Sequence, residues 1–427
     1  MPLDVDLTDL DRFANGFPHD VFTRLRREAP VWFHPPTEHT PGGEGFWVLS
    51  RYQDVSDAAH DAATFSSHRG GAREGGGTLI EDLPSGFAAG VLLNMMDDPR
   101  HRHFRRLVTP AVSPRALARI EDELRKRTEA ILDEVAERGA CDLVTDVATE
   151  LPLQAIAWLL GIPQEDRHQL FAWANATLDY DDRDLGETSD KVRAAQASLF
   201  AYGTELLQEK RRRPADDILS AVVHGRIPCA HAAGGSDAAD EPLQELELQM
   251  FFNLLIAAGS ETTRNSIAAG VKALVEHPDE WRALRADRSL LPTAVEEILR
   301  WASSTPYNRR TATRDVELRG QKIRAGDKVT LWWASANRDE DVFPDPFRLD
   351  VRRDPNPHLT FGHGTHFCLG AALARLEMRL VFEGLVERFA EIALAGPVEW
   401  TRSNKHTGVR HMPVAFVRDP AWKGARA

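Results

Sequence analysis

The sequence predicts a mainly α-helical protein with small β-sheets, and three observations support this prediction. Between residues 114 and 301 one segment after another has helical periodicity, and the longest runs from Glu245 to Glu276. Short runs of β-branched and aromatic residues near the N-terminus and after residue 315 predict strands. A turn rich in glycine and histidine, at residues 361–370, leads into an Ala/Leu-rich helix. We expect a single domain over residues 1–427.

The composition excludes several classes of protein. The chain has 52 Lys and Arg against 65 Asp and Glu, and the net charge of -13 argues against general nucleic-acid binding. Three cysteines, at positions 141, 229 and 368, make no disulfide framework and fit a reducing cytoplasm. The acidic N-terminus lacks the apolar core of a signal peptide, and no run approaches the roughly 20 apolar residues of a membrane span. We expect a monomeric, cytoplasmic protein without a membrane anchor.

The N-terminal part of the chain predicts two helices, a hairpin and a long loop. Residues 18–28 and 52–63 have helical patterns, and proline near the start of the first is compatible with a helix. Two apolar runs, at 31–33 and 46–49, flank a turn rich in Pro and Gly and predict a β-hairpin. Residues 66–93 are glycine-rich and aperiodic, and a loop of this length is usually functional.

A basic segment follows this loop. Asp97, Asp98 and Pro99 predict the start of a helix. Within that helix His101 and Arg105 stand four residues apart and share one face. Taken alone, this pattern is more typical of a solvated basic face than of a binding site.

The middle of the chain is helical and then breaks. The pattern predicts helices over residues 116–138, 143–160, 167–178, 190–213 and 219–223. Residues 225–243 are small, polar and aperiodic, which predicts a mobile surface loop. We expect Cys229 and His231 in this loop to have no functional role.

The longest helix contains a conflict between burial and polarity. Residues 250–258 are apolar nearly all round, so this part should be buried. Gly259, Ser260, Glu261, Thr262 and Thr263 follow at once, and buried polar groups cost stability unless they have partners. Such a conflict marks a functional site. The alternative to a functional site is that the threonine has only a structural role, since its hydroxyl can donate a hydrogen bond to the backbone carbonyl four residues earlier.

After the longest helix come a short helix and several strands. The helix over 292–301 carries Glu297 and Arg300, a spacing that usually gives a surface ion pair. Residues 315–318, 321–323 and 328–333 are strand-like, with a hairpin turn at Arg319 and Gly320.

The turn at residues 361–370 places one cysteine where a loop becomes a helix. The helix start offers Cys368 free N–H groups and the positive end of the dipole, both of which favour a thiolate. A thiolate held against a surface cleared by glycines can bind a metal ion. The alternative is a buried structural cysteine, the commoner role of a free cysteine.

The run F-G-x-G-x-H-x-C-L-G at residues 361–370 resembles the haem-binding loop of the cytochrome P-450 monooxygenases. The resemblance implies haem b with Cys368 as the axial ligand of the iron. It also implies the cytochrome P-450 fold, in which the haem lies between a long central helix and the helix after the cysteine. The similarity extends from about residue 15 to 417, and only the 225–243 loop looks additional.

The resemblance assigns roles to further residues. The motif Ala258-Gly259-Ser260-Glu261-Thr262-Thr263 implies that Glu261 and Thr262 deliver the protons consumed in O–O cleavage, with Gly259 leaving room for oxygen. The cofactor-binding residues it implies are His101, Arg105, Ala258, Gly259, Arg310, Phe361, Gly362, His366, Cys368 and Gly370. His101, Arg105, Arg310 and His366 would hold the haem propionates. The implied substrate pocket contains Leu92, Ile256, Ala257, Thr305 and Val409. Glu297, Arg300 and Arg348 would form a structural ion-pair group.

The implied activity is insertion of one oxygen atom from O2 into a C–H bond of a hydrophobic small molecule. Residues 308–315 and 408–413 look like the actinobacterial enzymes that oxidise terpenoid, steroid or branched-lipid substrates. A ferredoxin and its reductase would supply electrons, because no flavin or nicotinamide fingerprint occurs. We expect the ferredoxin to dock on a basic face formed by Arg100, Arg102, Arg106, Arg352, Arg353 and Arg379. Two alternatives remain: another oxidative outcome (desaturation, C–C cleavage or peroxygenation) and a non-catalytic haem-binding protein.

Overall fold

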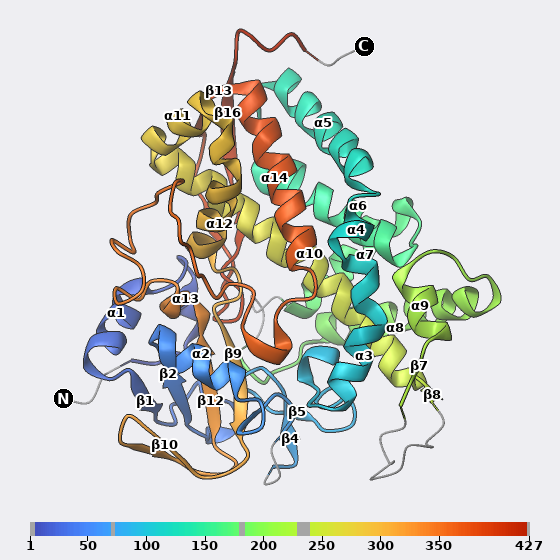
Figure 1. Ribbon diagram of the computed structural model, residues 1–427, viewed down its shortest axis with the longest axis vertical. Helices are drawn as coiled ribbons and strands as arrows, with labels where there is room; N and C mark the ends of the chain where they lie inside the picture. The colour runs from blue at the N-terminus through green and yellow to red at the C-terminus, as the bar shows by residue number, and fades with distance from the viewer. Residues whose placement is uncertain (1–4, 70–72, 179–183, 229–239, 425–427) are drawn as a thin grey trace.

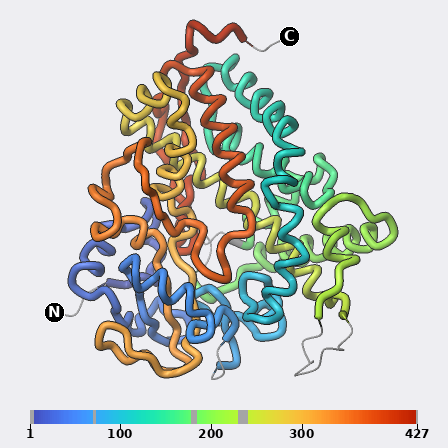
Figure 2. The backbone as a smooth tube through the Cα atoms, viewed as in Figure 1, coloured from blue at the N-terminus to red at the C-terminus, as the bar shows by residue number. Residues whose placement is uncertain are grey.

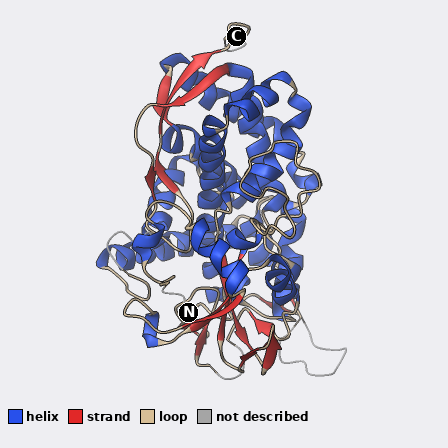
Figure 3. Cartoon of the chain, turned by 90° about the vertical axis from the view of Figure 1, so that its left-hand side faces the viewer, coloured by secondary structure: helices blue, strands red, loops and turns tan. Residues whose placement is uncertain are grey.

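Helices form the body of the protein, and β-sheets lie at its two ends (Figures 1 and 3). The computed structural model describes residues 5–69, 73–178, 184–228 and 240–424. The α-helices are α1 (His19–Glu28), α2 (Tyr52–His60), α3 (Arg100–Val108), α4 (Pro114–Leu117), α5 (Glu121–Arg138), α6 (Glu150–Leu160), α7 (Arg167–Leu178), α8 (Asp190–Arg212), α9 (Ile218–His224), α10 (Glu245–Glu276), α11 (Pro278–Ala286), α12 (Leu291–Ala302), α13 (Trp333–Ala336) and α14 (Ala371–Arg388).

The strands form one larger sheet and several small ones. They are β1 (Val31–His34), β2 (Phe46–Leu49), β3 (Phe65–Ser66), β4 (Gly75–Gly76), β5 (Leu83–Pro84), β6 (Ala140–Asp142), β7 (Arg226–Ile227), β8 (Glu241–Pro242), β9 (Tyr307–Ala312), β10 (Val316–Leu318), β11 (Gln321–Ile323), β12 (Lys328–Trp332), β13 (Phe389–Leu394), β14 (Glu399–Trp400), β15 (Val409–His411) and β16 (Pro413–Arg418). The larger sheet has the order β1-β2-β12-β9-β3, and β13-β16-β6 form a second sheet. In the larger sheet only β2 and β12 pair in parallel. This pairing joins an N-terminal strand to a strand from the last third of the chain, and the blue and orange segments lie side by side in Figure 2.

Helix α10 runs through the interior and contacts α6, α7, α8, α12 and α14. A capping box begins it, because the side chains of Gln244 and Glu247 satisfy each other's backbone N–H groups. The hydroxyls in its buried middle donate to carbonyls four residues earlier, Ser260 to Ile256 at 2.8 Å and Thr262 to Ala258 at 3.0 Å. These bonds satisfy the hydroxyls and so reduce the cost of burying them.

Most predicted elements are confirmed, with several differences. The helix predicted over 116–138 is divided into α4 and α5, and α14 starts at Ala371, after the turn that contains Leu369. Helices α11 and α13 and strands β3–β9 and β13–β16 were not predicted. The hairpin turn at Arg319 and Gly320 is confirmed, with positive φ at both residues. In the predicted 225–243 loop, β7 pairs with β8, while Cys229 and His231 lie outside the described residues.

The predicted ion-pair group is buried, but one of its members is wrong. Arg300 Nε and Nη2 each lie 2.7 Å from an oxygen of Glu297, and both side chains are fully buried. Arg353 Nε donates to Glu297 Oε2 at 3.1 Å, the role predicted for Arg348. Arg348 is exposed, and its carbonyl oxygen accepts a hydrogen bond from Arg353. Asn356 also donates to Glu297, so this group fixes the irregular segment before the cysteine turn.

Candidate active site

Positive φ angles at two glycines shape the turn before Cys368. Gly362 has φ of 71° and Gly364 has φ of 70°, a conformation that glycine adopts without strain. A Cβ at Gly364 would also lie 2.7 Å from the carbonyl oxygen of Ala59 in α2. The Cys368 N–H donates to the carbonyl oxygen of Phe361 at 2.8 Å, which closes the turn. The backbone conformation of the turn therefore favours glycine at these positions, independently of any role in binding.

The side chain of Cys368 lies at the wall of a cavity. This cavity has a volume of about 880 Å³, which leaves the residue accessible although the surrounding protein buries the thiol. Burial raises the pKa of the thiol, and the N–H groups of Gly370 and Ala371 lower it by less. The helix start therefore favours the thiolate, as predicted, but burial of the free thiol outweighs this effect. A coordinated metal ion would remove the proton outright.

The cavity is lined mainly by apolar side chains from α8, α10 and the 78–95 segment. The apolar lining residues include Leu79, Leu83, Phe87, Leu92, Met95, Phe200, Met250, Leu254, Ala257, Leu299, Leu373 and Ala374. A few polar groups interrupt this lining, among them Asn253, Thr305 and Asn308. An apolar cavity with a few polar groups is typical of a small-molecule site.

Three of the five predicted substrate-pocket residues line the cavity, and two do not. Leu92, Ala257 and Thr305 line the cavity. Ile256 and Val409 do not, and both pack in the main hydrophobic core. Ile256 lies on another face of α10 than Ala257, and Val409 is the first residue of β15, so these two predictions are wrong.

Basic side chains gather beside the cysteine turn, and none of them has an acidic side chain within hydrogen-bond distance among the described residues. Arg310 and His366 line the cavity, and the rings of His366 and His101 are 4.2 Å apart. Arg105 donates to the carbonyl oxygen of Phe367, although neither it nor His101 lines the cavity. Burial lowers the pKa of Arg310 to about 10. Burial also lowers the pKa of His366, and Arg310, His101 and Arg105 lower it further.

This basic cluster fits the acidic groups of a haem. Both ring nitrogens of buried His101 lack a hydrogen-bond partner within the described residues, and Asp98 lies 3.6 Å from Nδ1. Buried donors that repel one another need an anion nearby. Haem carries two carboxylates, and its iron accepts a thiolate. Phe361, Gly362, Ala258 and Gly370 also line the cavity, so the residues present fit this group.

Of the two residues predicted to deliver protons, only one lines the cavity. Thr262 lines it, whereas Glu261 is buried beside it. Glu261 Oε1 accepts a hydrogen bond of 3.4 Å from Arg264, and Oε2 lies 4.0 Å from His406 Nδ1. Glu261 therefore belongs to a small polar group behind the cavity wall.

The absence of a side chain at Gly259 allows two helices to pack closely, which the sequence did not reveal. A Cβ at this position would lie 2.8 Å from Cδ1 of Ile156 in α6. The missing side chain lets α6 approach α10, while Gly259 still lines the cavity. Gly259 thus has a role in helix packing in addition to the predicted role of leaving room for oxygen, which stays a prediction.

Sequence analysis missed two residues of the cavity wall, Lys405 and His406. They lie in an irregular segment that reaches the cavity before β15 begins. Lys405 Nζ donates to the carbonyl oxygen of Tyr307 at 2.8 Å, and burial lowers its pKa to about 7. The sequence signal for them is the run of polar residues at 402–407, ahead of the strand that begins at Val409.

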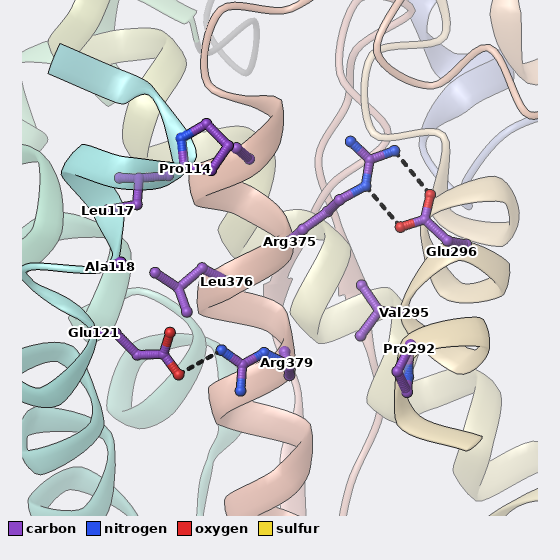
Figure 4. A pocket seen from close by; sticks show the side chains of 11 residues that line it. Pro114, Leu117, Ala118, Glu121, Pro292, Val295, Glu296, Arg375, Leu376 and Arg379 are labelled. Atoms are coloured by element: carbon purple, nitrogen blue, oxygen red, sulfur yellow. Dashed lines mark hydrogen bonds and ion pairs between the residues drawn. The ribbon is translucent and has the colours of Figure 1, made fainter. Parts of the chain in front are cut away.

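A second hollow lies between α4, α5, α12 and α14 (Figure 4). Arg375 spans it to Glu296 with hydrogen bonds of 2.7 and 2.8 Å, and Arg379 pairs with Glu121 at 2.7 Å. Arg379 is thus neutralised within the protein, as Arg100 is by Glu247 and Arg353 by Glu297. These three arginines of the predicted docking face are therefore already paired within the protein, and the docking face stays a prediction.

Comparisons with a family model and with curated proteins point to the same protein family. The family model described as Cytochrome P450 matches residues 7–409. Cytochrome P450 126 of Mycobacterium tuberculosis is 51% identical over 411 residues, which cover 96% of this chain and 97% of that protein. The steroid C26-monooxygenase of Rhodococcus jostii is 37% identical and covers 97% and 85% of the two chains. The methyl-branched lipid omega-hydroxylase of Mycobacterium bovis is 38% identical, with 97% and 95% covered.

A solved structure is similar throughout its length. The cytochrome P450 of Mycobacterium marinum in complex with pseudoionone has a TM-score of 0.86 and 35% identity, covering 97% of this chain and 98% of that one. Among the residues that the structure describes, no helix is long and apolar enough to cross a membrane.

Proposed function

Because this chain belongs to the cytochrome P450 family and is a haem-thiolate oxidoreductase that incorporates oxygen, we propose that it hydroxylates a branched, hydrophobic small molecule with electrons from a ferredoxin. One observation carries the site assignment: Cys368 and Thr262 line the same apolar cavity of about 880 Å³. When bound, the haem supplies the activation of O2, which side chains alone cannot provide.

In this proposal, the residues of the chain bind the cofactor and deliver protons to the cavity. Cys368 would ligate the iron, while His101, Arg105, Arg310 and His366 would hold the propionates through charge-assisted hydrogen bonds. Thr262 would donate a proton at its Oγ into the cavity, and Glu261 would replace that proton from behind. The apolar part of the lining would limit the water in the cavity, so that protons would reach Thr262 mainly through Glu261.

Relatives support the substrate class. One relative is named a steroid C26-monooxygenase and another a methyl-branched lipid omega-hydroxylase. The cavity of this chain is lined by leucine, methionine and phenylalanine side chains, with Asn253, Thr305 and Asn308 able to orient a single oxygen function. We therefore infer a substrate with a long apolar part and few polar groups.

A ferredoxin is the electron donor that we propose. Of the six arginines predicted for docking, Arg102 and Arg106 of α3 are exposed and form no ion pair with any residue that the structure describes. Helix α3 contacts the cysteine turn through Arg105, so these two charges lie near the ligand loop. An acidic ferredoxin would suit this short basic stretch.

The proposal is tested by the balance between product and hydrogen peroxide. A steroid with a branched side chain and a methyl-branched fatty acid would first be screened for a substrate-induced spin shift. With the better ligand, Thr262→Ala and Glu261→Gln should each lower the ratio of hydroxylated product to peroxide by about 100-fold, the low end for loss of a proton-transfer group.

Ser260→Ala is the matched control, because Ser260 is buried in the same helix and does not line the cavity. Full coupling in Thr262→Ala would contradict the proposed role of Thr262. A desaturated or cleaved product, identified by mass, would support the alternative oxidative outcomes. Absence of any O2- or peroxide-dependent product with every ligand that shifts the spin state would support a non-catalytic haem-binding protein.

A further inference from the structure

The carboxylate of Glu261 is held at one oxygen and open at the other. Oε1 accepts a hydrogen bond from Arg264, whose guanidinium also lies within 3.5 Å of Asn175 in α7. Oε2 is buried and has no hydrogen-bond partner in the part of the chain that is described. A buried carboxylate oxygen without a donor is costly, so a donor is expected there for at least part of the time.

The ring of His406 faces this open oxygen. His406 Nδ1 lies 4.0 Å from Glu261 Oε2, and it is itself buried with no hydrogen-bond partner among the described residues. Two orphaned atoms of complementary chemistry thus face each other at slightly more than hydrogen-bond distance. A small rotation of either side chain would bring them into contact.

His406 touches both the cavity and Glu261. It lines the cavity, whereas Glu261 does not. Its segment is fixed on both sides, because Thr407 N–H donates to the carbonyl oxygen of Ser304 at 3.0 Å and Lys405 Nζ donates to that of Tyr307 at 2.8 Å. The ring is therefore positioned between the cavity and the buried carboxylate.

Three charged groups surround the imidazole. Glu261 and Arg264 face it from α10, and Lys405 precedes it in its own segment. Burial lowers the pKa of His406, Glu261 raises it, and Lys405 and Arg264 lower it further. The ring is therefore mainly neutral at neutral pH, a form in which one nitrogen can release a proton while the other accepts one.

We propose that His406 supplies protons to Glu261, by transfer from Nδ1 to Oε2. The Nδ1–H bond breaks as the Oε2–H bond forms, and Nε2 takes a proton from solvent, so the imidazole stays neutral. The inference rests on the proposed role of Glu261 in proton delivery. His406 acts through Glu261, so it is a positioning and proton-supplying residue that need not touch the substrate.

The first test measures the coupling of the two side chains without turnover. Histidine-labelled protein in the diamagnetic ferrous CO complex would be titrated by NMR, with the His406 signal among 16 histidines assigned from the His406→Gln variant. Glu261→Gln should lower the pKa of His406 by about one unit, because it removes a nearby opposite charge. Glu123→Gln, an exposed carboxylate on α5, is the control. An unchanged pKa in Glu261→Gln would overturn the proposal.

The second test separates proton supply from simple support of Glu261. His406→Asn keeps an amide donor near the position of Nδ1 but cannot pass a proton on. We expect both His406→Asn and His406→Gln to lower the product-to-peroxide ratio about tenfold, a smaller loss than the roughly 100-fold expected for Glu261→Gln, because Glu261 and Thr262 remain in place. The pH dependence that the ratio shows near the pKa of His406 should be lost as well.

The outcomes distinguish the two proposals. If His406→Asn keeps full coupling at every pH while Thr262→Ala loses it, the inference about His406 fails and the proposed function stands. If Thr262→Ala and Glu261→Gln also keep full coupling, the proposed function fails first.

Discussion

Arg353 Nε lies 3.1 Å from Glu297 Oε2 and completes the buried ion-pair group of Glu297 and Arg300. Glu297 also accepts hydrogen bonds from the backbone N–H of Asp350 at 3.0 Å and from Asn356 at 3.1 Å. One fully buried carboxylate thus ties α12 to the irregular segment that leads to the cysteine turn.

This relationship predicts different effects of two nearby arginine substitutions. Arg353→Gln should lower the free energy of unfolding by about 2 kcal/mol, since it removes a hydrogen bond to a buried charge. Arg348→Gln should change it by less than about 0.5 kcal/mol, because Arg348 is exposed. Chemical unfolding of the haem-loaded protein measures both. A larger effect at Arg348 would contradict the assignment.

The packing of Gly259 against α6 predicts a rescue. Gly259→Ala should destabilise the protein by about 1–3 kcal/mol, because the new methyl overlaps Ile156 Cδ1. Ile156→Val removes that atom, so the double variant should regain part of the loss in a double-mutant cycle. Strictly additive effects would show that the two residues do not compete for the same space.

The orphaned nitrogens of His101 predict weaker haem retention on substitution. His101→Gln should speed haem transfer to apomyoglobin about tenfold, which corresponds to about 1.4 kcal/mol for one lost charge-assisted hydrogen bond. His103→Gln in the same helix is the control, because His103 is more exposed and outside the cluster. Equal release rates for the two variants would argue that His101 does not contact the haem.

A buried carboxyl in α14 predicts a dependence of stability on pH. Burial raises the pKa of Glu377 from 4.5 to about 8, so the folded protein binds more protons than the unfolded chain between these values. Stability from this group is present below pH 4.5 and is lost as pH rises through about 8. Glu377→Gln should therefore flatten the fall in unfolding free energy across this window. An unchanged slope would show that Glu377 is ionised throughout.

Local patterns in the sequence were sufficient for most elements. The apolar run before Gly259 predicts a buried helix, and α10 is buried there. The two runs beside the first turn predict the β1–β2 hairpin, and it forms with Val31 opposite Leu49. The pairing of β2 with β12 places Trp47 opposite Val329, far apart in the chain, and no local pattern encodes such a register.

Other details depend on tertiary packing. A helix that is apolar all round does not show which side faces a cavity, so Ile256 and Ala257 could not be distinguished from sequence. The segment around Arg348 and Arg353 is irregular, so neither periodicity nor spacing identifies which guanidinium reaches Glu297. The contact between Glu261 and His406 joins α10 to the C-terminal part of the chain, and only the fold brings them together.

The central claim is that the thiolate of Cys368 ligates haem iron, and the absorption spectrum of the reduced, CO-bound protein tests it most directly. The wild-type protein should show the Soret band characteristic of thiolate ligation, and Cys368→Ser should lose it. Cys141→Ser is the control, because burial raises the pKa of Cys141 to about 12 and it lies in β6. A Cys368→Ser protein that binds haem with the unaltered thiolate spectrum would contradict the account.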